Sequence, residues 1–296
     1  MTRRRLDNRA SWTAQVCAAQ RAAETLQPSE IRRLDDPYAR HFVVHPVLRA
    51  AQFHPLAARA FISMIDRQSP NLHTFIVLRV RYVEDVYRAA LDDGIDQIVL
   101  LGAGFDTTSL RWAASSVTVF EVDAPSTLSD KRTLLDAHLP SPADNARTVW
   151  VPCDFEHDQL QQRLLDCGFD PARPCVVAWI GVTMFLTREA IAATLADLAA
   201  LCAPHSRLVL DYIDEDVVTE ASRWAGARRV ARSVARRGEP YRTGFTQEGI
   251  VFLLAQHGFA CTDHARAPSL AQRYTSTSDN PAKGDDWLTV CAARRN

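Results

Sequence analysis

Two apolar runs of the chain end in residues that could bind a nucleoside. The first run, residues 97–101, leads into Gly102-Ala103-Gly104, and the next ends at Glu121-Val122-Asp123. An apolar run that stops at Gly-x-Gly is typical of a buried parallel strand followed by a sharp turn, where backbone can approach a ligand. An acidic residue that ends the neighbouring strand can accept hydrogen bonds from both hydroxyls of a ribose. The spacing therefore predicts a nucleoside site beyond these strand ends.

The residues after the second glycine narrow the choice of nucleoside. A dinucleotide fingerprint has a third glycine three residues later, but here Thr107 occupies that position and Asp106 precedes it. A carboxylate beside the turn repels a pyrophosphate, whereas it suits a cationic ligand without phosphates. S-adenosylmethionine (SAM) is such a ligand. A NAD-type site and a plain tight turn stay open as alternatives at this point.

Composition and charge exclude several other classes of protein. A chain of 296 residues with 47% hydrophobic residues can bury a large core without disulfides or a metal. The formal net charge of −1 gives no general attraction to nucleic acid or to an anionic membrane. Seven scattered cysteines without a Cys-x-x-Cys pair argue against a disulfide framework and against a zinc site. Since no apolar stretch reaches membrane-spanning length, we expect a soluble cytoplasmic protein without a metal.

Strands and helices alternate along the second part of the sequence. This alternation predicts an α/β fold with a doubly wound, mostly parallel sheet of seven strands, as in a Rossmann-like domain. The stretch from Pro268 to Gly284 is rich in turn residues and is expected to be a loop. Strands are expected near residues 97–101, 119–123, 148–151, 174–180, 207–212, 259–263 and 287–292.

Helices dominate the sequence before the first strand. We expect residues 1–93 to form a helical cover over the ligand edge, as part of the same domain as a core at 94–296. A helix capped by Ser11, another beginning at Asp36-Pro37 and short ones at Pro46 and Pro55 are predicted there. A basic helical insertion at about 215–245 is either a solvated helix or a lid over an acidic substrate.

Set side by side, these segments resemble class I SAM-dependent methyltransferases of the leucine carboxyl methyltransferase-like (PPM-type) group. The resemblance is closest to bacterial proteins associated with O-methylation of natural products. Several separated motifs in the same order are more specific than one glycine turn. They are Ala10–Ala14, Asp36-Pro37-Tyr38-Ala39, Arg79-Val80-Arg81-Tyr82, Leu101–Thr107, Phe120–Pro125 with Lys131, Asp154-Phe155 and Trp179–Leu186.

The resemblance implies a role in SAM binding for several residues. Gly102 and Gly104 would let backbone approach the methionyl part, and Asp123 with its neighbour Glu121 would bind the ribose hydroxyls. Arg79 would pair with the SAM carboxylate, because a guanidinium donates two parallel hydrogen bonds to such a group; the alternative for Arg79 is an acidic partner within its own helix. The remaining expected cofactor contacts are Ala103 in the turn, Asp154 and Phe155 at the adenine, and Trp179 at the end of the fourth strand.

Contacts to the substrate are less defined by the sequence. Arg21 on the first helix and Tyr212 at the end of the fifth strand are candidates for substrate binding. The nine histidines show no pair at a telling spacing, so no catalytic residue is assigned. A carboxylate acceptor needs no general base, whereas a phenol or alcohol would gain from one.

Two departures from the family pattern leave the acceptor open. Ile180 and Phe185 stand where the carboxyl methyltransferases are expected to have a glutamate and a tyrosine. The favoured function is a SAM-dependent O-methyltransferase acting on a carboxyl or hydroxyl oxygen of a small molecule. The alternatives are a carboxyl methyltransferase acting on a protein or peptide C-terminus, and a SAM-binding protein without transfer activity. Oligomeric state is not predicted.

Overall fold

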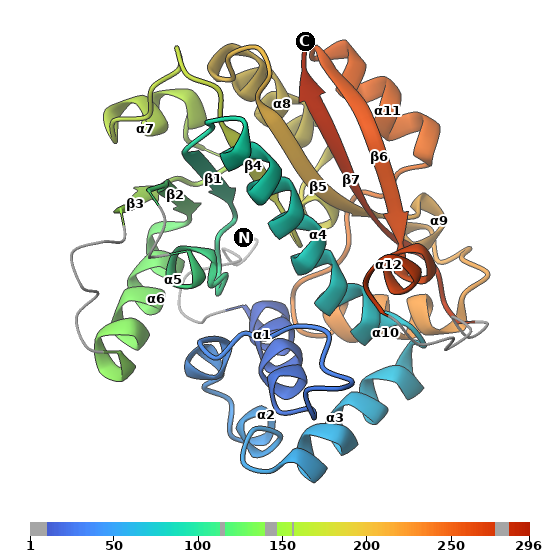
Figure 1. Ribbon diagram of the computed structural model, residues 1–296. Coiled ribbons are helices and arrows are strands. Elements are labelled where there is room, and N and C mark those ends of the chain that lie inside the picture. The colour runs from blue at the N-terminus through green and yellow to red at the C-terminus, as the bar shows by residue number, and fades with distance from the viewer. Residues whose placement is uncertain (1–10, 113–115, 140–146, 156, 276–283) are drawn as a thin grey trace.

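The computed structural model describes residues 11–112, 116–139, 147–155, 157–275 and 284–296. Within these residues one seven-stranded sheet forms the centre, in the order β3-β2-β1-β4-β5-β7-β6 (Figure 1). Strands β1 to β5 pair in parallel, and β7 is antiparallel to both of its neighbours. The predicted α/β fold with a mostly parallel sheet is therefore confirmed. The strands are β1 (Gln97–Leu101), β2 (Thr118–Asp123), β3 (Arg147–Pro152), β4 (Val176–Trp179), β5 (Arg207–Ile213), β6 (Phe259–Arg266) and β7 (Leu288–Arg295).

The strand order reverses its direction between β1 and β4. From β1 the chain continues outward through β2 and β3, and then returns to β4 on the other side of β1. In open α/β sheets, ligands bind beyond the carboxyl ends of the strands at such a reversal. The residues that follow β1, β2 and β4 are therefore the ones that the topology places at a ligand site.

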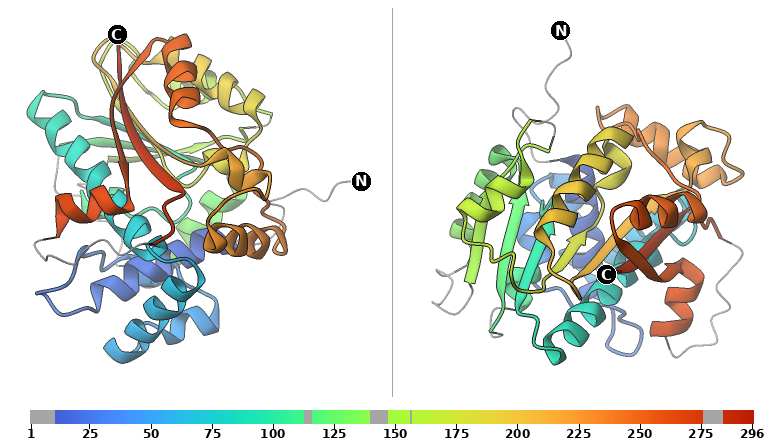
Figure 2. Two further views of the ribbon diagram at one scale, coloured as in Figure 1. Left: turned by 90° about the vertical axis from the view of Figure 1, so that its right-hand side faces the viewer. Right: turned by 90° about the horizontal axis from the view of Figure 1, so that it is seen from above.

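Helices cover both faces of the sheet (Figure 2). In β1, Ile98 and Leu100 pack into a core with α4 and α12, whereas Val99 and Leu101 pack into a core with α7, α8 and α11. Because both faces are covered, the strand is apolar throughout rather than alternating. The helices are α1 (Trp12–Thr25), η1 (Ala39–Phe42), α2 (Pro46–Ala50), α3 (Pro55–Gln68), α4 (Leu72–Asp92), α5 (Thr108–Arg111), α6 (Pro125–His138), α7 (Leu160–Asp166), η2 (Thr183–Phe185), α8 (Arg188–Leu201), α9 (Glu215–Val218), α10 (Ala225–Ala235), α11 (Gln247–Gln256) and α12 (Ala267–Tyr274).

Helices α1, α2 and α3 lie at the end of the sheet where β5 and the other parallel strands finish (Figure 1). They share a separate apolar cluster with η1, and Phe105 from the turn after β1 belongs to that cluster. Helix α4, which the sequence assigns to the cover, instead packs along one face of the sheet through buried residues from Phe75 to Ala90. Because Phe105 packs among α1, α2 and α3, these helices contact the turn after β1 directly.

Local capping chemistry sets several helix starts, among them those predicted at Ser11, Pro46 and Pro55. The Ser11 hydroxyl accepts a hydrogen bond from the Ala14 N–H at 3.2 Å. Thr187 and Thr246 cap α8 and α11 in the same way. Pro46 and Pro55 each open a helix, where a missing N–H leaves no hydrogen bond unmade.

Two local predictions were wrong. The expected helix after Asp36-Pro37 is only the short 3-10 helix η1, and the Asp36 carboxylate also forms an ion pair with Arg21. The expected loop from Pro268 contains helix α12, which buries Ala267 and Leu270; the part at 276–283 lies outside the described residues. Among the helices that the structure describes, none combines the length and hydrophobicity needed to cross a membrane.

Candidate functional site

The glycine turn after β1 folds back onto the end of β2. The Gly104 N–H donates to Asp123 Oδ2 at 2.7 Å, and the Ala124 N–H donates to Oδ1 at 2.7 Å. Burial raises the pKa of the Asp123 carboxyl above its ordinary value, although both N–H groups oppose this. The structure therefore brings the predicted turn and the predicted ribose carboxylate together at the switch in strand order.

The two glycines of this turn do different work. Both have positive φ, 67° at Gly102 and 43° at Gly104. A Cβ at Gly102 would lie 2.3 Å from Val182 Cγ2, whereas a Cβ at Gly104 would meet nothing closer than 3.8 Å. Gly102 thus lets the segment after β4 pack against the turn, whereas a Cβ at Gly104 would make only ordinary van der Waals contacts. Ala103, between them, is buried.

The end of β3 extends the site next to Asp123. The Cys153 N–H donates to the Asp123 carbonyl oxygen at 2.9 Å, so Asp154 and Phe155 follow directly beside the end of β2. The Asp154 carbonyl oxygen accepts from the N–H groups of His157 and Asp158, which fixes this turn. The role of Asp154 and Phe155 in binding adenine stays a prediction.

Glu121 is turned inward, two residues before Asp123. Its Oε2 lies 2.7 Å from Lys131 Nζ, and its Oε1 accepts from the Ser109 hydroxyl at 2.6 Å. The side chains of Glu121 and Lys131 are both fully buried. Lys131 and Ser109 thus hold Glu121 inside the core, whereas Asp123 is the last residue of β2, and the ribose contact of Glu121 stays a prediction.

Arg79 lies on α4 and faces the ends of β4 and β5. Its guanidinium forms a buried ion pair with Asp211 on β5, and its Nη2 lies 3.7 Å from Cys17 Sγ. The same Asp211 accepts from the Gly181 N–H at 2.6 Å. The alternative of an acidic partner within the helix is therefore wrong. Although burial opposes it, the Asp211 charge raises the pKa of Arg79.

The Arg79 side chain also has an unused donor. Its Nε is buried and has no hydrogen-bond partner among the residues that the structure describes. An unpartnered buried donor costs free energy, and a ligand acceptor would relieve it. Arg79 thus keeps one donor for a ligand acceptor, and its pairing with the carboxylate of SAM stays a prediction.

The structure gives internal contacts to the other three predicted residues. Trp179 is fully buried in the core beneath α8. The Tyr212 ring lies in the same core, with its hydroxyl 3.4 Å from His264 Nδ1, and its neighbour Asp211 points to the other face. Arg21 pairs with Asp36 and donates to the Phe105 carbonyl oxygen. Substrate contacts by Arg21 and Tyr212 are not supported by this arrangement.

The basic segment docks against the cover and the sheet. In α10 the Arg229 Nε donates to the Gln68 carbonyl oxygen at 2.8 Å, and the helix buries Val230 and Val234. After α10, Glu239 accepts from the Thr13 N–H at the start of α1. The arginines of α10 thus bond to backbone or lie at the surface, and the segment closes over the start of α1.

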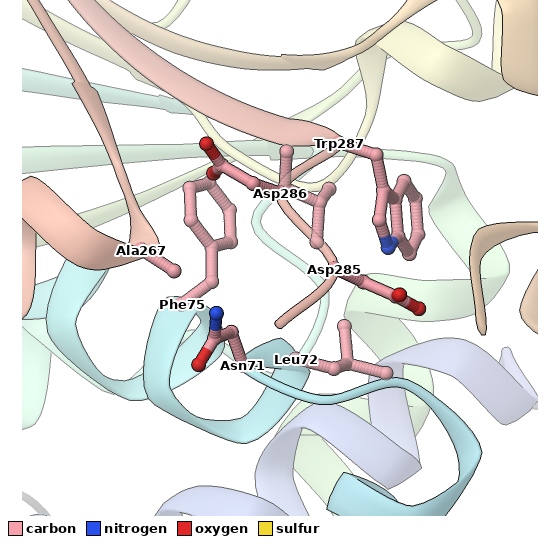
Figure 3. A pocket seen from close by; sticks show the side chains of 8 residues that line it. Asn71, Leu72, Phe75, Ala267, Asp285, Asp286 and Trp287 are labelled. Atoms are coloured by element: carbon pink, nitrogen blue, oxygen red, sulfur yellow. The ribbon is translucent and has the colours of Figure 1, made fainter. Parts of the chain in front are cut away.

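Two hollows lie away from the predicted cofactor residues. Figure 3 shows a small crevice beside the start of α4, lined among others by Asn71, Phe75 and Trp287. A groove of about 660 Å³ lies on the outer side of α4, next to Arg81 and Trp112. Neither lining includes a residue predicted to bind the cofactor.

Comparison with known proteins agrees with this geometry. The sequence model of the leucine carboxyl methyltransferase family matches residues 14–199. A provisionally named SAM-dependent methyltransferase of Mycolicibacterium smegmatis is 36% identical over 220 residues, 71% of this chain and 69% of that protein. Another, from Mycobacteroides abscessus, is 30% identical over 298 residues, 94% of this chain and 90% of that protein.

Two solved structures share the fold over nearly the whole chain. A provisionally named methyltransferase of Thermobifida fusca superposes with a TM-score of 0.62 at 16% identity, covering 98% of this chain and 97% of the other. A DUF574 family protein of Streptomyces avermitilis gives 0.57 at 18% identity, covering 98% and 100%. The chain therefore belongs to the leucine carboxyl methyltransferase family of SAM-dependent methyltransferases, with the class I fold.

Proposed function

We propose that this chain is an O-methyltransferase that uses SAM to methylate a carboxyl or hydroxyl oxygen of a small molecule, such as a natural product. The observation that carries the proposal is the bond from the Gly104 N–H to Asp123 at the switch in strand order. It places the glycine turn and a carboxylate side by side at the point where this sheet type binds ligands.

Different residues would bind different parts of SAM. Asp123 would accept from the ribose hydroxyls, Asp154 and Phe155 would contact the adenine, and Arg79 would donate to the carboxylate. When bound, the cofactor supplies a methyl group activated by a sulfonium. The chain holds the acceptor oxygen close and in line with the bond that breaks, and it excludes water.

Tyr241 bears on the kind of acceptor. Its ring lies 5.4 Å from that of Phe185 and 6.2 Å from that of Trp287, so it packs against η2 and the residue before β7. Burial raises the pKa of the Tyr241 hydroxyl, which therefore stays protonated. It can donate a hydrogen bond but cannot act as a base, and a carboxylate acceptor needs none.

The two departures from the family pattern have polar neighbours. Asp211 bonds to the N–H of Gly181, next to Ile180, and the Tyr241 hydroxyl belongs to the ring beside Phe185. Polar groups thus remain at both places, which supports transfer activity over an inert SAM-binding protein. Arg229 and Arg232 give no support to a peptide C-terminus as acceptor, because Arg229 is bonded to backbone and Arg232 to Glu220.

Calorimetry and methyl transfer test the proposal in order. Titration with SAM and with S-adenosylhomocysteine (SAH) should show one site per chain. Transfer of a labelled methyl group to a panel of small carboxylic acids and phenols should then yield a labelled product, and lability of that product to base identifies an ester. A folded chain that binds neither SAM nor SAH, or that binds both and methylates only peptides, would contradict the proposal.

A further inference from the structure

Two buried cationic side chains, Arg21 and Lys131, donate hydrogen bonds to consecutive carbonyl groups in the turn after β1. Arg21 Nη2, from α1, donates to the Phe105 carbonyl oxygen at 2.6 Å. Lys131 Nζ, from α6, donates to the Asp106 carbonyl oxygen at 2.6 Å. Phe105 and Asp106 directly follow Gly104 in the sequence. Side chains of α1 and α6, which are far apart in the sequence, thus both hold the backbone that follows the glycine turn.

Each cation has its own buried carboxylate. Arg21 Nε lies 2.8 Å from Asp36 Oδ2, and Lys131 Nζ lies 2.7 Å from Glu121 Oε2. Both carboxylates are completely shielded from solvent. The two pairs therefore add no net charge beside a cationic ligand, and they supply donors with fixed directions.

Thr107 ties the turn to the cover a second time. Its hydroxyl donates to Asp36 Oδ2 at 2.8 Å and accepts from Arg111 Nε at 3.0 Å. This is the position where a dinucleotide-binding turn has its third glycine. Here the side chain that replaces the glycine joins the Asp36 network instead of leaving room for a pyrophosphate.

We propose that the Arg21–Asp36 and Lys131–Glu121 pairs are positioning residues that set the affinity for the cofactor without touching it. This inference rests on the proposed function. By fixing the Phe105 and Asp106 carbonyl groups, they keep the Gly104 N–H on Asp123 before the cofactor arrives. A turn that is already ordered loses less conformational freedom on binding, and a loosened one binds more weakly.

Arg21→Lys tests the inference with the charge retained. A lysine ammonium is a point donor on a flexible stem, so it reaches Asp36 or the Phe105 carbonyl group but does not hold both as the planar fork does. Arg33→Lys is the matched control, because Arg33 pairs with the buried Glu24 in the same cover and bonds to Thr74, away from the turn. Urea unfolding of both variants separates loss of stability from loss of binding.

Calorimetry with SAH gives the deciding values. We expect Arg21→Lys to weaken SAH binding by about tenfold or more, with Arg33→Lys within about twofold of wild type at a similar urea midpoint. Equal SAH affinity in Arg21→Lys and wild type would overturn the inference and leave the proposed function intact. Equal weakening by Arg33→Lys would also overturn it, because the loss would then be a general loosening of the cover.

A second variant covers the case in which Arg21→Lys does not fold. Thr107→Val removes the hydroxyl at nearly constant volume and leaves the Arg21–Asp36 pair in place. It should weaken SAH binding in the same direction by a smaller factor, whereas Thr133→Val, which removes an exposed hydroxyl bonded within α6, should not. A wild-type chain that binds neither SAM nor SAH would remove the proposed function and this inference together.

Discussion

The guanidinium of Arg79 and the carboxylate of Asp211 form an ion pair whose side chains are 7% and 0% exposed. The pair joins α4 to β5, and through the Gly181 N–H it also holds the turn after β4. The side chain expected to receive the SAM carboxylate is thus oriented by a carboxylate of the chain itself. A buried charge that depends on one partner is sensitive to loss of that partner.

Asp211→Asn should strongly destabilise the fold. It removes the negative charge at nearly constant shape and leaves Arg79 buried without a counter-ion, which costs about 3–5 kcal/mol in comparable pairs. Urea unfolding followed by circular dichroism measures the loss. Asp214→Asn is the control: Asp214 accepts two hydrogen bonds from Arg266, but both side chains are partly exposed, so its loss should be clearly smaller than that of Asp211→Asn. Equal losses in the two variants would contradict the role given to burial.

Gly104→Ala should affect binding more than stability. The Gly104 backbone has φ 43°, so alanine there is strained by about 1–2 kcal/mol, and its Cβ would lie in the turn proposed to bind the cofactor. Gly168→Ala is the matched control, with φ 85° and nothing within 4 Å of an added Cβ. We expect similar losses of stability in both variants and weaker SAH binding, by about tenfold or more, in Gly104→Ala alone. Unchanged affinity in folded Gly104→Ala would show that the ligand does not bind against this glycine.

The sequence predicts the strand ends well because they depend on local patterns. An apolar run, a Gly-x-Gly turn and a terminal carboxylate are each readable within a few residues, and parallel pairing then brings Gly104 and Asp123 to the same edge. Capping residues such as Ser11 mark helix starts for the same reason. These features carry the fold and the centre of the candidate site.

Partners of buried charges could not be predicted from the sequence. Arg79 pairs with a residue 132 positions away, so no spacing rule reveals Asp211. Asp211 and Tyr212 are neighbours on one strand and point to opposite faces, and the sequence does not say which face meets the site. Asp36 was expected as a helix cap. It does accept from the Ala39 N–H, but its partnership with Arg21 depends on how the cover folds. Helix α12 was missed because Pro268 was interpreted as a loop residue, although proline is favoured in a first helical turn.

Gly226→Ala should disturb the docking of the basic helix. A Cβ at Gly226, in the first turn of α10, would lie 1.7 Å from Asp285 Oδ2 and 2.6 Å from Ser69 Cα. Because backbone as well as a side chain blocks the added atom, α10 must shift, at a cost of about 1–3 kcal/mol in the free energy of unfolding.

Gly249→Ala provides the comparison for Gly226→Ala. Its Cβ would meet only the Thr246 hydroxyl, at 3.1 Å, and alanine is the better helix former. Urea unfolding of this variant should therefore show stability equal to or above wild type. If Gly226→Ala is as stable as Gly249→Ala, α10 does not depend on close contact with Ser69 and Asp285.

Affinity for SAH should decrease as the pH is lowered through the pKa of Asp123. Burial raises the pKa of this carboxyl, while the Gly104 and Ala124 N–H groups, the Lys131 charge and the Thr127 hydroxyl oppose the rise. Above the raised pKa the ionised carboxylate accepts from the ribose hydroxyls. As the pH falls through that pKa the group gains a proton and loses acceptor capacity, so binding weakens at a pH above the ordinary Asp value of about 3.9.

Asp123→Asn separates this titration from other effects of acid. The amide does not ionise, so the variant should bind SAH about tenfold or more weakly at neutral pH, and its affinity should change little over the range in which wild type weakens. Calorimetry at a series of pH values measures both curves, and circular dichroism at each pH confirms that the chain is folded. Parallel curves for wild type and variant would show that another group causes the pH dependence, and the ribose role of Asp123 would then have no support from it.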